Sequence, residues 1–164
     1  MKIYIIGPVG SGKTTFSEFL SNKYNIKKHE LDKVVWDDDN GNVKRSIEEI
    51  NKLFEKIINQ KSWIIEDVGR NKFKKGRDEA DIIYYLKISR FKSYYRVLKR
   101  WLKQRLGKER YNYPPTIGQI FYYISTVNSY FKKEPMILEA LKKYKDKVIY
   151  LKSKEVNNIL NIRE

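Results

Sequence analysis

A nine-residue stretch near the N-terminus has residue types at a spacing that suits anion binding. It reads Gly7-Pro8-Val9-Gly10-Ser11-Gly12-Lys13-Thr14-Thr15 and fits the pattern G-x-x-x-x-G-K-[ST]. Its glycines allow positive φ angles and a close backbone approach, so that successive N–H groups can point into one concavity. The stretch therefore predicts a phosphate-binding P-loop. All nine residues are candidate nucleotide ligands, with Lys13 on the β- and γ-phosphates and the Thr14 hydroxyl on Mg²⁺.

The residues on either side of this stretch suit the same interpretation. Residues 1–6 are β-branched and apolar, which is typical of a buried parallel strand. After the loop, apolar side chains recur at helical spacing at Phe16, Phe19, Leu20 and Tyr24. The order is thus strand, glycine-rich loop and helix, and a helix opening near Lys13 would add the positive end of its dipole.

Length and composition exclude several classes of protein. A chain of 164 residues predicts one domain, over residues 1–164. The absence of cysteine excludes a disulfide framework and thiolate catalysis, and a single histidine, His29, excludes a histidine-rich metal site. No run approaches the roughly 18 apolar residues of a membrane span, and the N-terminus lacks a signal-peptide pattern. We therefore expect a cytoplasmic protein without a membrane partner, either a monomer or a homodimer.

The net charge of +15 is concentrated in one segment. Residues 87–110 contain ten basic residues and one acid, Glu109. Three readings of the charge remain open: a nucleic-acid partner, a polyphosphate ligand, or a general bias in composition.

Patterns along the chain predict alternating strands and helices. We expect strands over 2–6, 26–32, 62–67, 81–87 and 147–151, and helices over 13–24, 46–58, 91–106, 117–131, 135–144 and 153–160. Ser46 and Glu49 form a capping box at the start of the second helix. Its expected apolar face is Ile47, Ile50, Leu53, Phe54, Ile57 and Ile58.

This alternation predicts an α/β fold with a parallel sheet covered by helices on both faces. Ligands of such sheets bind at the carboxyl ends of the strands. The P-loop, Asp32 and the pair Glu66-Asp67 each follow an expected strand. We therefore expect them to meet in one crevice, although they are far apart in the sequence.

The chain resembles the small P-loop proteins known as DNA topology modulation (FlaR-related) proteins, in the adenylate-kinase-like group of P-loop kinases. The resemblance covers nearly the whole chain. Besides the P-loop, it rests on Leu31-Asp32-x-x-x-Trp36, on Trp63-Ile64-Ile65-Glu66 with Val68-Gly69-Arg70, and on Arg96-x-x-x-Arg100 with Arg110 downstream. Relatives often carry glycine where this chain has Asp67.

The resemblance implies a P-loop NTPase fold of three α/β/α layers. Its five-stranded parallel sheet would have the order 2-3-1-4-5, with a helical lid between strands 4 and 5. We expect that basic lid over residues 88–135. The resemblance also implies ATP and Mg²⁺ as cofactors, but it does not supply the substrate that accepts the phosphoryl group.

In kinases of this fold, an acid after strand 2 often orients the phosphate acceptor or a metal-bound water, and we expect one of these roles for Asp32. Trp36 either stacks on a planar substrate or belongs to the core. Arg70 is expected to hold a phosphate or carboxylate of the acceptor, for which a planar guanidinium fork suits better than an ammonium. Each side chain also has a structural reading, as a turn, core or surface residue.

Glu66 and Asp67 follow an apolar strand, as the acid of a Walker B pattern does. Such an acid holds Mg²⁺ directly or through water. The sequence leaves open which of the two faces the metal.

The helix over 91–106 is expected to present a basic face, with Arg96, Arg100 and Lys103 at spacings of four and three residues. Val97, Leu98, Trp101 and Leu102 would mark its opposite, packed side. Cations can stabilise the transition state of phosphoryl transfer, so Arg96, Arg100 and Arg110 are candidate catalytic residues. The competing use of this face is a track of contacts to nucleic-acid phosphates.

Aromatic residues gather after the expected lid loop, and we interpret them mainly as the core of a helical subdomain. They are Tyr111, Tyr113, Phe121, Tyr122, Tyr123, Tyr130 and Phe131. The resulting hypothesis is an ATP-dependent kinase for a small acceptor. The alternative is a nucleic-acid-associated ATP-binding protein that uses the basic helix over 90–110.

Overall fold

The computed structural model describes residues 1–38, 40–41, 43–109 and 115–161. The main sheet consists of β1 (Lys2–Ile6), β2 (Lys28–Glu30), β5 (Trp63–Asp67), β6 (Ile82–Lys87) and β7 (Val148–Lys152). A separate small hairpin consists of β3 (Trp36–Asp37) and β4 (Val43–Lys44). The α-helices are α1 (Lys13–Tyr24), α2 (Leu31–Val35), α3 (Ile47–Ile58), α4 (Lys74–Glu79), α5 (Arg90–Arg105), α6 (Ile117–Leu141) and α7 (Ser153–Asn161). Two 3₁₀ helices are η1 (Asn71–Phe73) and η2 (Lys142–Tyr144).

The five strands of the main sheet are all parallel and lie in the order β2-β5-β1-β6-β7. Counted along the chain, this is the expected order 2-3-1-4-5. The chain leaves β1 toward β2 and β5 on one side and returns to β6 and β7 on the other. The crevice at the carboxyl end of β1 is therefore the place where ligands bind in such sheets.

Alternating side chains of β1 pack into two separate cores, one on each face of the sheet. Ile3 and Ile5 lie in a core with Phe16 and Leu20 of α1 and Val156 of α7. Tyr4 and Ile6 lie in a core on the other face with residues of α2, α3 and the end of α6. The fold is thus the expected three-layer α/β/α arrangement.

Local signals explain where two of the helices begin and end. Ser46 caps α3, because its hydroxyl accepts from the Glu49 N–H while the Glu49 carboxylate accepts from the Ser46 N–H. Asn25 ends α1 in the left-handed conformation, with φ 52°. On α3 the expected apolar face is wrong at Ile47, which is 78% exposed, and at Leu53, which is partly exposed.

The second strand is shorter than the sequence predicts. β2 ends at Glu30, and Asp32 lies in the first turn of α2 rather than at the end of a strand. Leu31, Val34 and Val35 have the i, i+3, i+4 spacing of a helix and are all buried. Their burial favours a short helix over an extended strand.

The two helices expected over 117–131 and 135–144 form one helix, α6, that continues through Pro135, followed by η2. Proline removes a backbone donor and costs roughly 3 kcal/mol inside a helix. Tyr130 and Leu141 on either side of it are buried, and Ile137 and Leu138 pack against the same core. Burying such side chains contributes about 1.5–3 kcal/mol each, which offsets the cost of the proline.

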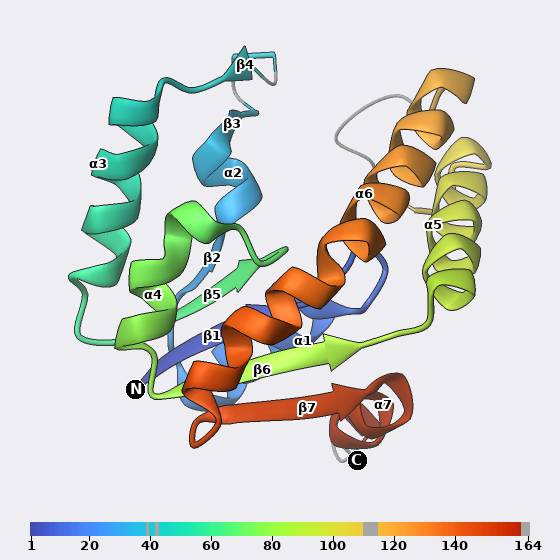
Figure 1. Cartoon of the computed structure of the whole chain (residues 1–164). Helices are drawn as coiled ribbons and strands as arrows, with labels where there is room; N and C mark the ends of the chain where they lie inside the picture. The colour runs from blue at the N-terminus through green and yellow to red at the C-terminus, as the bar shows by residue number, and fades with distance from the viewer. Residues whose placement is uncertain (39, 42, 110–114, 162–164) are drawn as a thin grey trace.

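Helices α5 and α6 connect β6 to β7 and pack against each other beside the carboxyl end of the sheet (Figure 1). The Trp101 indole N–H donates to the Thr116 carbonyl at 3.0 Å, and the Tyr94 hydroxyl donates to the Asn128 side-chain oxygen. Within the described residues, no helix has the length and apolar character needed to span a membrane.

Candidate functional site

The P-loop joins the end of β1 to the start of α1. Gly10 and Gly12 have φ angles of 78° and 95°, a region that L side chains rarely adopt. The expectation of a positive φ is wrong at Gly7, where close packing requires glycine instead. A Cβ at Gly7 would lie 2.7 Å from Ser11 Oγ and 3.0 Å from the Leu86 carbonyl oxygen.

Lys13 and Thr14 begin α1 and lie beside the carboxylate of Glu66. The Lys13 ammonium donates to the Pro8 carbonyl at 3.0 Å, and the Thr14 hydroxyl donates to Glu66 Oε2 at 3.2 Å. Burial lowers the pKa of Lys13, and the carboxylates of Glu66, Asp32 and Asp67 act in the opposite direction. Burial raises the pKa of Glu66 to about 7, although Lys13 acts to lower it.

The neighbouring acids at the end of β5 face different partners. Asp67 Oδ2 accepts from the backbone N–H of Gly69 at 2.9 Å and of Arg70 at 2.7 Å, and from the Tyr4 hydroxyl at 3.3 Å. Glu66 Oε1 is buried and has no hydrogen-bond partner among the residues that the structure describes. Of the two acids, Glu66 is therefore the one that presents an unsatisfied oxygen beside the P-loop.

Arg70 connects two of the predicted site residues. Its guanidinium donates to Asp67 Oδ1 at 2.6 Å through Nη1, and to Asp32 Oδ1 through Nη2. The Asp32 side chain is 64% exposed, whereas Asp67 is buried. The structure therefore brings Asp32, Asp67 and Arg70 together in one ion-paired group, beside the P-loop as expected.

Helix α5 lies directly over the P-loop. The Ser93 hydroxyl donates to the Val9 carbonyl at 2.5 Å, and Arg96 Nη1 donates to the Gly10 carbonyl at 3.0 Å. A Cβ at Gly10 would lie 3.3 Å from the Ser93 carbonyl oxygen. The sequence did not identify Ser93 as a residue that contacts the P-loop, because a serine in a basic helix is not typical of any binding role. Only its position one turn before Val97 indicates that it lies on the inner face of the helix.

The inner face of α5 differs from the expected one. Val97 is buried and Trp101 is partly buried, as predicted, but Leu98 and Leu102 are each 50% exposed, so the predicted packed side is wrong at these two leucines. Arg96 and Arg100 instead point inward, and the Arg100 guanidinium lies 5.2 Å from the Tyr123 ring centroid. Arg100 Nε is buried without a hydrogen-bond partner within the described part of the chain.

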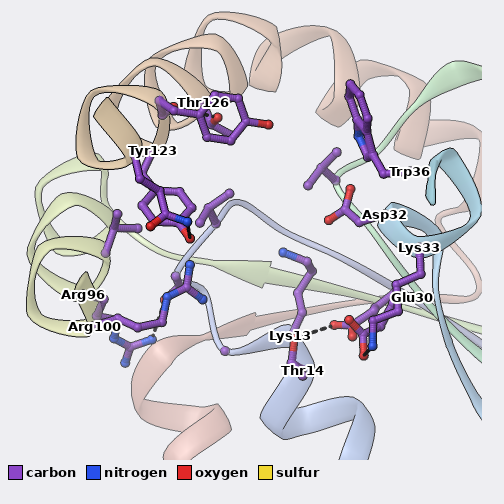
Figure 2. Close-up of a pocket in the computed structure, with 18 of the residues that line it drawn as sticks. Lys13, Thr14, Glu30, Asp32, Lys33, Trp36, Arg96, Arg100, Tyr123 and Thr126 are labelled. Carbon is purple, nitrogen blue, oxygen red and sulfur yellow. Dashed lines mark hydrogen bonds and ion pairs between the residues drawn. The ribbon is translucent and has the colours of Figure 1, made fainter. Parts of the chain in front are cut away.

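These groups line one cleft of about 1230 Å³. Figure 2 shows Arg96, Arg100, Tyr123 and Thr126 on one wall, Asp32, Lys33, Glu30 and Trp36 on the other, and Lys13 and Thr14 between them. Trp36 packs against the core around Leu31 and also lines the cleft, so its stacking on a substrate stays a prediction. The cleft therefore has a cationic wall, an acidic wall and a P-loop floor.

Helix α6 adds side chains to the cleft that the sequence did not single out as site residues. Gln119 and Thr126 line it at a spacing of seven residues, together with Tyr122 and Tyr123. The expected aromatic core is confirmed at Tyr130, which is buried, but Phe121 and Tyr122 are 66% and 61% exposed. Arg110, Tyr111 and Tyr113 lie outside the described residues.

The donor set fits a nucleotide and a magnesium ion. At the P-loop, the buried Ser11 Oγ and Glu66 Oε1 have no hydrogen-bond partner among the described residues. No group of three or more His, Asp or Glu side chains in that part of the chain is arranged to hold a metal. A magnesium ion here would need phosphate oxygens and water beside Thr14 and Glu66, which is how this ion is usually bound.

No protein-family model matches the sequence, and a comparison with curated proteins gives no match. Solved structures do match. One is a gluconokinase from Sinorhizobium meliloti 1021, with a TM-score of 0.54 and 13% sequence identity, over 95% of this chain and 87% of that chain. At this identity the likeness concerns the fold. The chain therefore shares the three-layer α/β fold of this gluconokinase.

Proposed function

We propose that the protein is a P-loop phosphotransferase that transfers the γ-phosphoryl group of ATP to a small hydroxyl-bearing acceptor. The observation that carries this proposal is the composition of this cleft. It combines a P-loop with Lys13, the hydrogen-bonded pair Thr14 and Glu66, inward-pointing arginines on α5, and the exposed carboxylate of Asp32. The neighbouring gluconokinase fold supports a kinase of this kind.

Each group has a defined task in this proposal. Backbone N–H groups of residues 7–15 and the Lys13 ammonium bind the nucleotide phosphates. Thr14 and Glu66 hold Mg²⁺, which neutralises charge on the β- and γ-phosphates when bound. Asp67 is occupied by Arg70 and backbone donors, and so has a supporting role instead.

Asp32 orients the acceptor hydroxyl and takes up its proton. The acceptor oxygen forms a bond to the γ-phosphorus, and the bond from that phosphorus to the β–γ bridging oxygen breaks. The electron pair of the broken bond leaves with ADP. Arg96 and Arg100 stabilise the charge of the transition state, and α5 and α6 act as the lid that excludes water.

Asp32→Asn should lower acceptor-dependent ATP consumption at least tenfold while leaving ATP affinity nearly unchanged, because only acceptor orientation and proton uptake are lost. Coupled ADP release with candidate hydroxyl acceptors measures the rate, and calorimetric titration measures the affinity. Asp146→Asn, an exposed carboxylate in the turn before β7, is the matched control. An unaltered rate with the true acceptor would refute this role of Asp32.

Magnesium affinity should depend on pH through Glu66. The folded protein holds its pKa at about 7, above the ordinary value of 4.5, so the carboxylate is mostly protonated below pH 7 and mostly ionised above it. Only the ionised form binds the metal, and the Mg²⁺ affinity should therefore rise about tenfold per pH unit as pH increases from 5.5 toward 7, then level off.

Magnesium titrations of ATP turnover between pH 5.5 and 8.5 measure this dependence. Glu66→Gln should weaken Mg²⁺ binding and remove the pH slope, whereas Asp67→Asn should retain the slope. A slope that persists in Glu66→Gln would show that another group controls the metal.

The specific family assignment, the DNA topology modulation proteins, is part of the proposal, as is a cytoplasmic location.

One observation favours the alternative of a nucleic-acid-associated ATP-binding protein. Lys92, Lys99 and Lys103 are all exposed on α5, where they are available to phosphates outside the cleft. Binding of this kind would weaken steeply with increasing salt concentration.

A further inference from the structure

The two walls of the cleft carry charge of opposite sign (Figure 2). Lys13 on the floor and Arg96 and Arg100 of α5 form the cationic side, which also includes one acid, Glu109. The opposite side, here named the acceptor wall, consists of Glu30, Asp32, Lys33, Trp36 and Asp38. It contains three carboxylates and one ammonium, Lys33. The Glu30 carboxylate lies 3.3 Å from this ammonium and 3.7 Å from that of Lys28, which does not line the cleft.

Arg70 is the other cation beside the acceptor wall, and both ends of its guanidinium are already engaged. Nη1 donates to Asp67 and Nη2 donates to Asp32. These contacts use two of the five N–H donors of the guanidinium, so an anionic acceptor that reached Arg70 would lie beside two carboxylates that already share it. Displacing Asp67 from Arg70 would leave a buried carboxylate without its ion pair, which is strongly unfavourable.

We propose that the acceptor carries no anionic group: it is an uncharged or cationic hydroxyl compound. This proposal rests on the phosphotransferase function proposed above and narrows its substrate class. A phosphate or carboxylate of the acceptor would lie against Glu30, Asp32 and Asp38. Repulsion between like charges would weaken the binding of such an anionic compound, and proteins commonly reject unwanted ligands in this way. The polyphosphate of ATP meets the opposite, cationic wall.

The remaining features of the acceptor wall suit the same class. Trp36 is partly buried and lines the cleft, so its ring can contact the apolar face of a neutral compound or the charge of a cationic one. Arg70 then has a different role from the one predicted from the sequence. It holds the Asp32 carboxylate in position rather than binding the acceptor, and is a positioning residue.

The test uses inorganic phosphate as an anionic probe of the acceptor wall. The protein is first saturated with the β,γ-imido analogue of ATP and Mg²⁺, so that the P-loop is filled, and phosphate is then titrated by calorimetry. Wild type should bind phosphate only weakly at this wall. Asp32→Asn should bind phosphate at least about tenfold more tightly than wild type, because one like-charge contact is removed. Asp146→Asn should behave as wild type does.

Two results would overturn the proposal. The first is phosphate binding to nucleotide-saturated wild type that Arg70→Lys weakens, because that places an anion on Arg70. The second is an Asp32→Asn variant that gains no phosphate affinity. Equal phosphate affinity of wild type, Arg70→Lys and Asp32→Asn would place the phosphate away from the acceptor wall. This result also overturns the proposal, because Asp32→Asn again gains no phosphate affinity.

The first step of the same experiment separates this inference from the function on which it rests. Absence of binding by the ATP analogue would overturn both the phosphotransferase function and the acceptor class. Normal binding of the analogue followed by Arg70-dependent phosphate binding would overturn the acceptor class alone.

Discussion

Lys13→Ala should abolish useful ATP binding and turnover while leaving the fold intact. The Lys13 ammonium is held over the P-loop by the Pro8 carbonyl, next to the carboxylate of Glu66. Replacing it removes the cation that contacts the β- and γ-phosphates and leaves the acids of the cleft without their nearest balancing charge. The core around Ile3, Ile5 and Phe16 does not involve the lysine head group, so folding should persist.

Thermal unfolding with and without ATP–Mg²⁺ measures this effect. A ligand at 100 times its Kd adds about 2.7 kcal/mol to the free energy of unfolding. Wild type should gain this stability and Lys13→Ala should gain almost none, while both unfold cooperatively without ligand. Lys52→Ala, an exposed lysine on α3, is the control. Equal stabilisation and equal turnover in wild type and Lys13→Ala would contradict the nucleotide site.

Arg100→Ala should lower kcat on the roughly 10³-fold scale of a lost arginine-finger contact, with a far smaller change in ATP affinity. Arg100 Nε is buried beside the cleft without a partner in the described structure, and its guanidinium lies over Tyr123. A contact made mainly in the closed, reacting state stabilises the transition state more than the ground state. The loss should therefore appear in kcat.

The same substitution separates the kinase from the nucleic-acid alternative. Lys103→Ala, an exposed residue on the same helix, is the matched control. In a kinase, Arg100→Ala slows turnover and Lys103→Ala does not. In a nucleic-acid binder, Lys103→Ala would instead lower affinity for labelled duplex and single-stranded probes and reduce the salt slope by about one contact. Reduced nucleic-acid binding with unchanged kinetics of both variants would favour the alternative.

The sheet and its order could be predicted from the sequence because local and global signals agree. The P-loop fixes the junction of β1 and α1, and buried apolar runs mark the other strands. The capping box at Ser46 and the left-handed residue Asn25 mark helix ends through contacts only a few residues apart. Such signals need no knowledge of tertiary packing.

The orientation of α5 could not be predicted in the same way. Its apolar residues suggested a packed side, but Leu98 and Leu102 are half exposed, and Arg96 and Arg100 face inward. The side that packs is set by the contact of Ser93 with Val9, residues 84 positions apart in the sequence. A hydrophobic pattern cannot identify an inner face that is built around polar contacts to another loop.

The roles of neighbouring acids also depend on tertiary contacts. The sequence left Glu66 and Asp67 equivalent, whereas the structure directs Glu66 toward Thr14 and Asp67 toward Arg70. Successive residues of a strand point to opposite faces, but which face meets the P-loop depends on the register of β5 against β1. The continuation of α6 through Pro135 likewise depends on the burial of its side chains against the sheet. Helix propensities describe the local sequence and do not include this burial.

The claim that the protein transfers the γ-phosphoryl group of ATP to a small hydroxyl compound is tested most directly by identifying the molecule that receives this group. ATP labelled at the γ-phosphate is incubated with the protein, Mg²⁺ and a pool of small hydroxyl compounds, and the products are separated by chromatography. The proposed function predicts label on an organic compound, dependent on Mg²⁺ and strongly reduced in Asp32→Asn and Arg100→Ala. Label found only in ATP and free phosphate, at a rate that no acceptor changes, would contradict it.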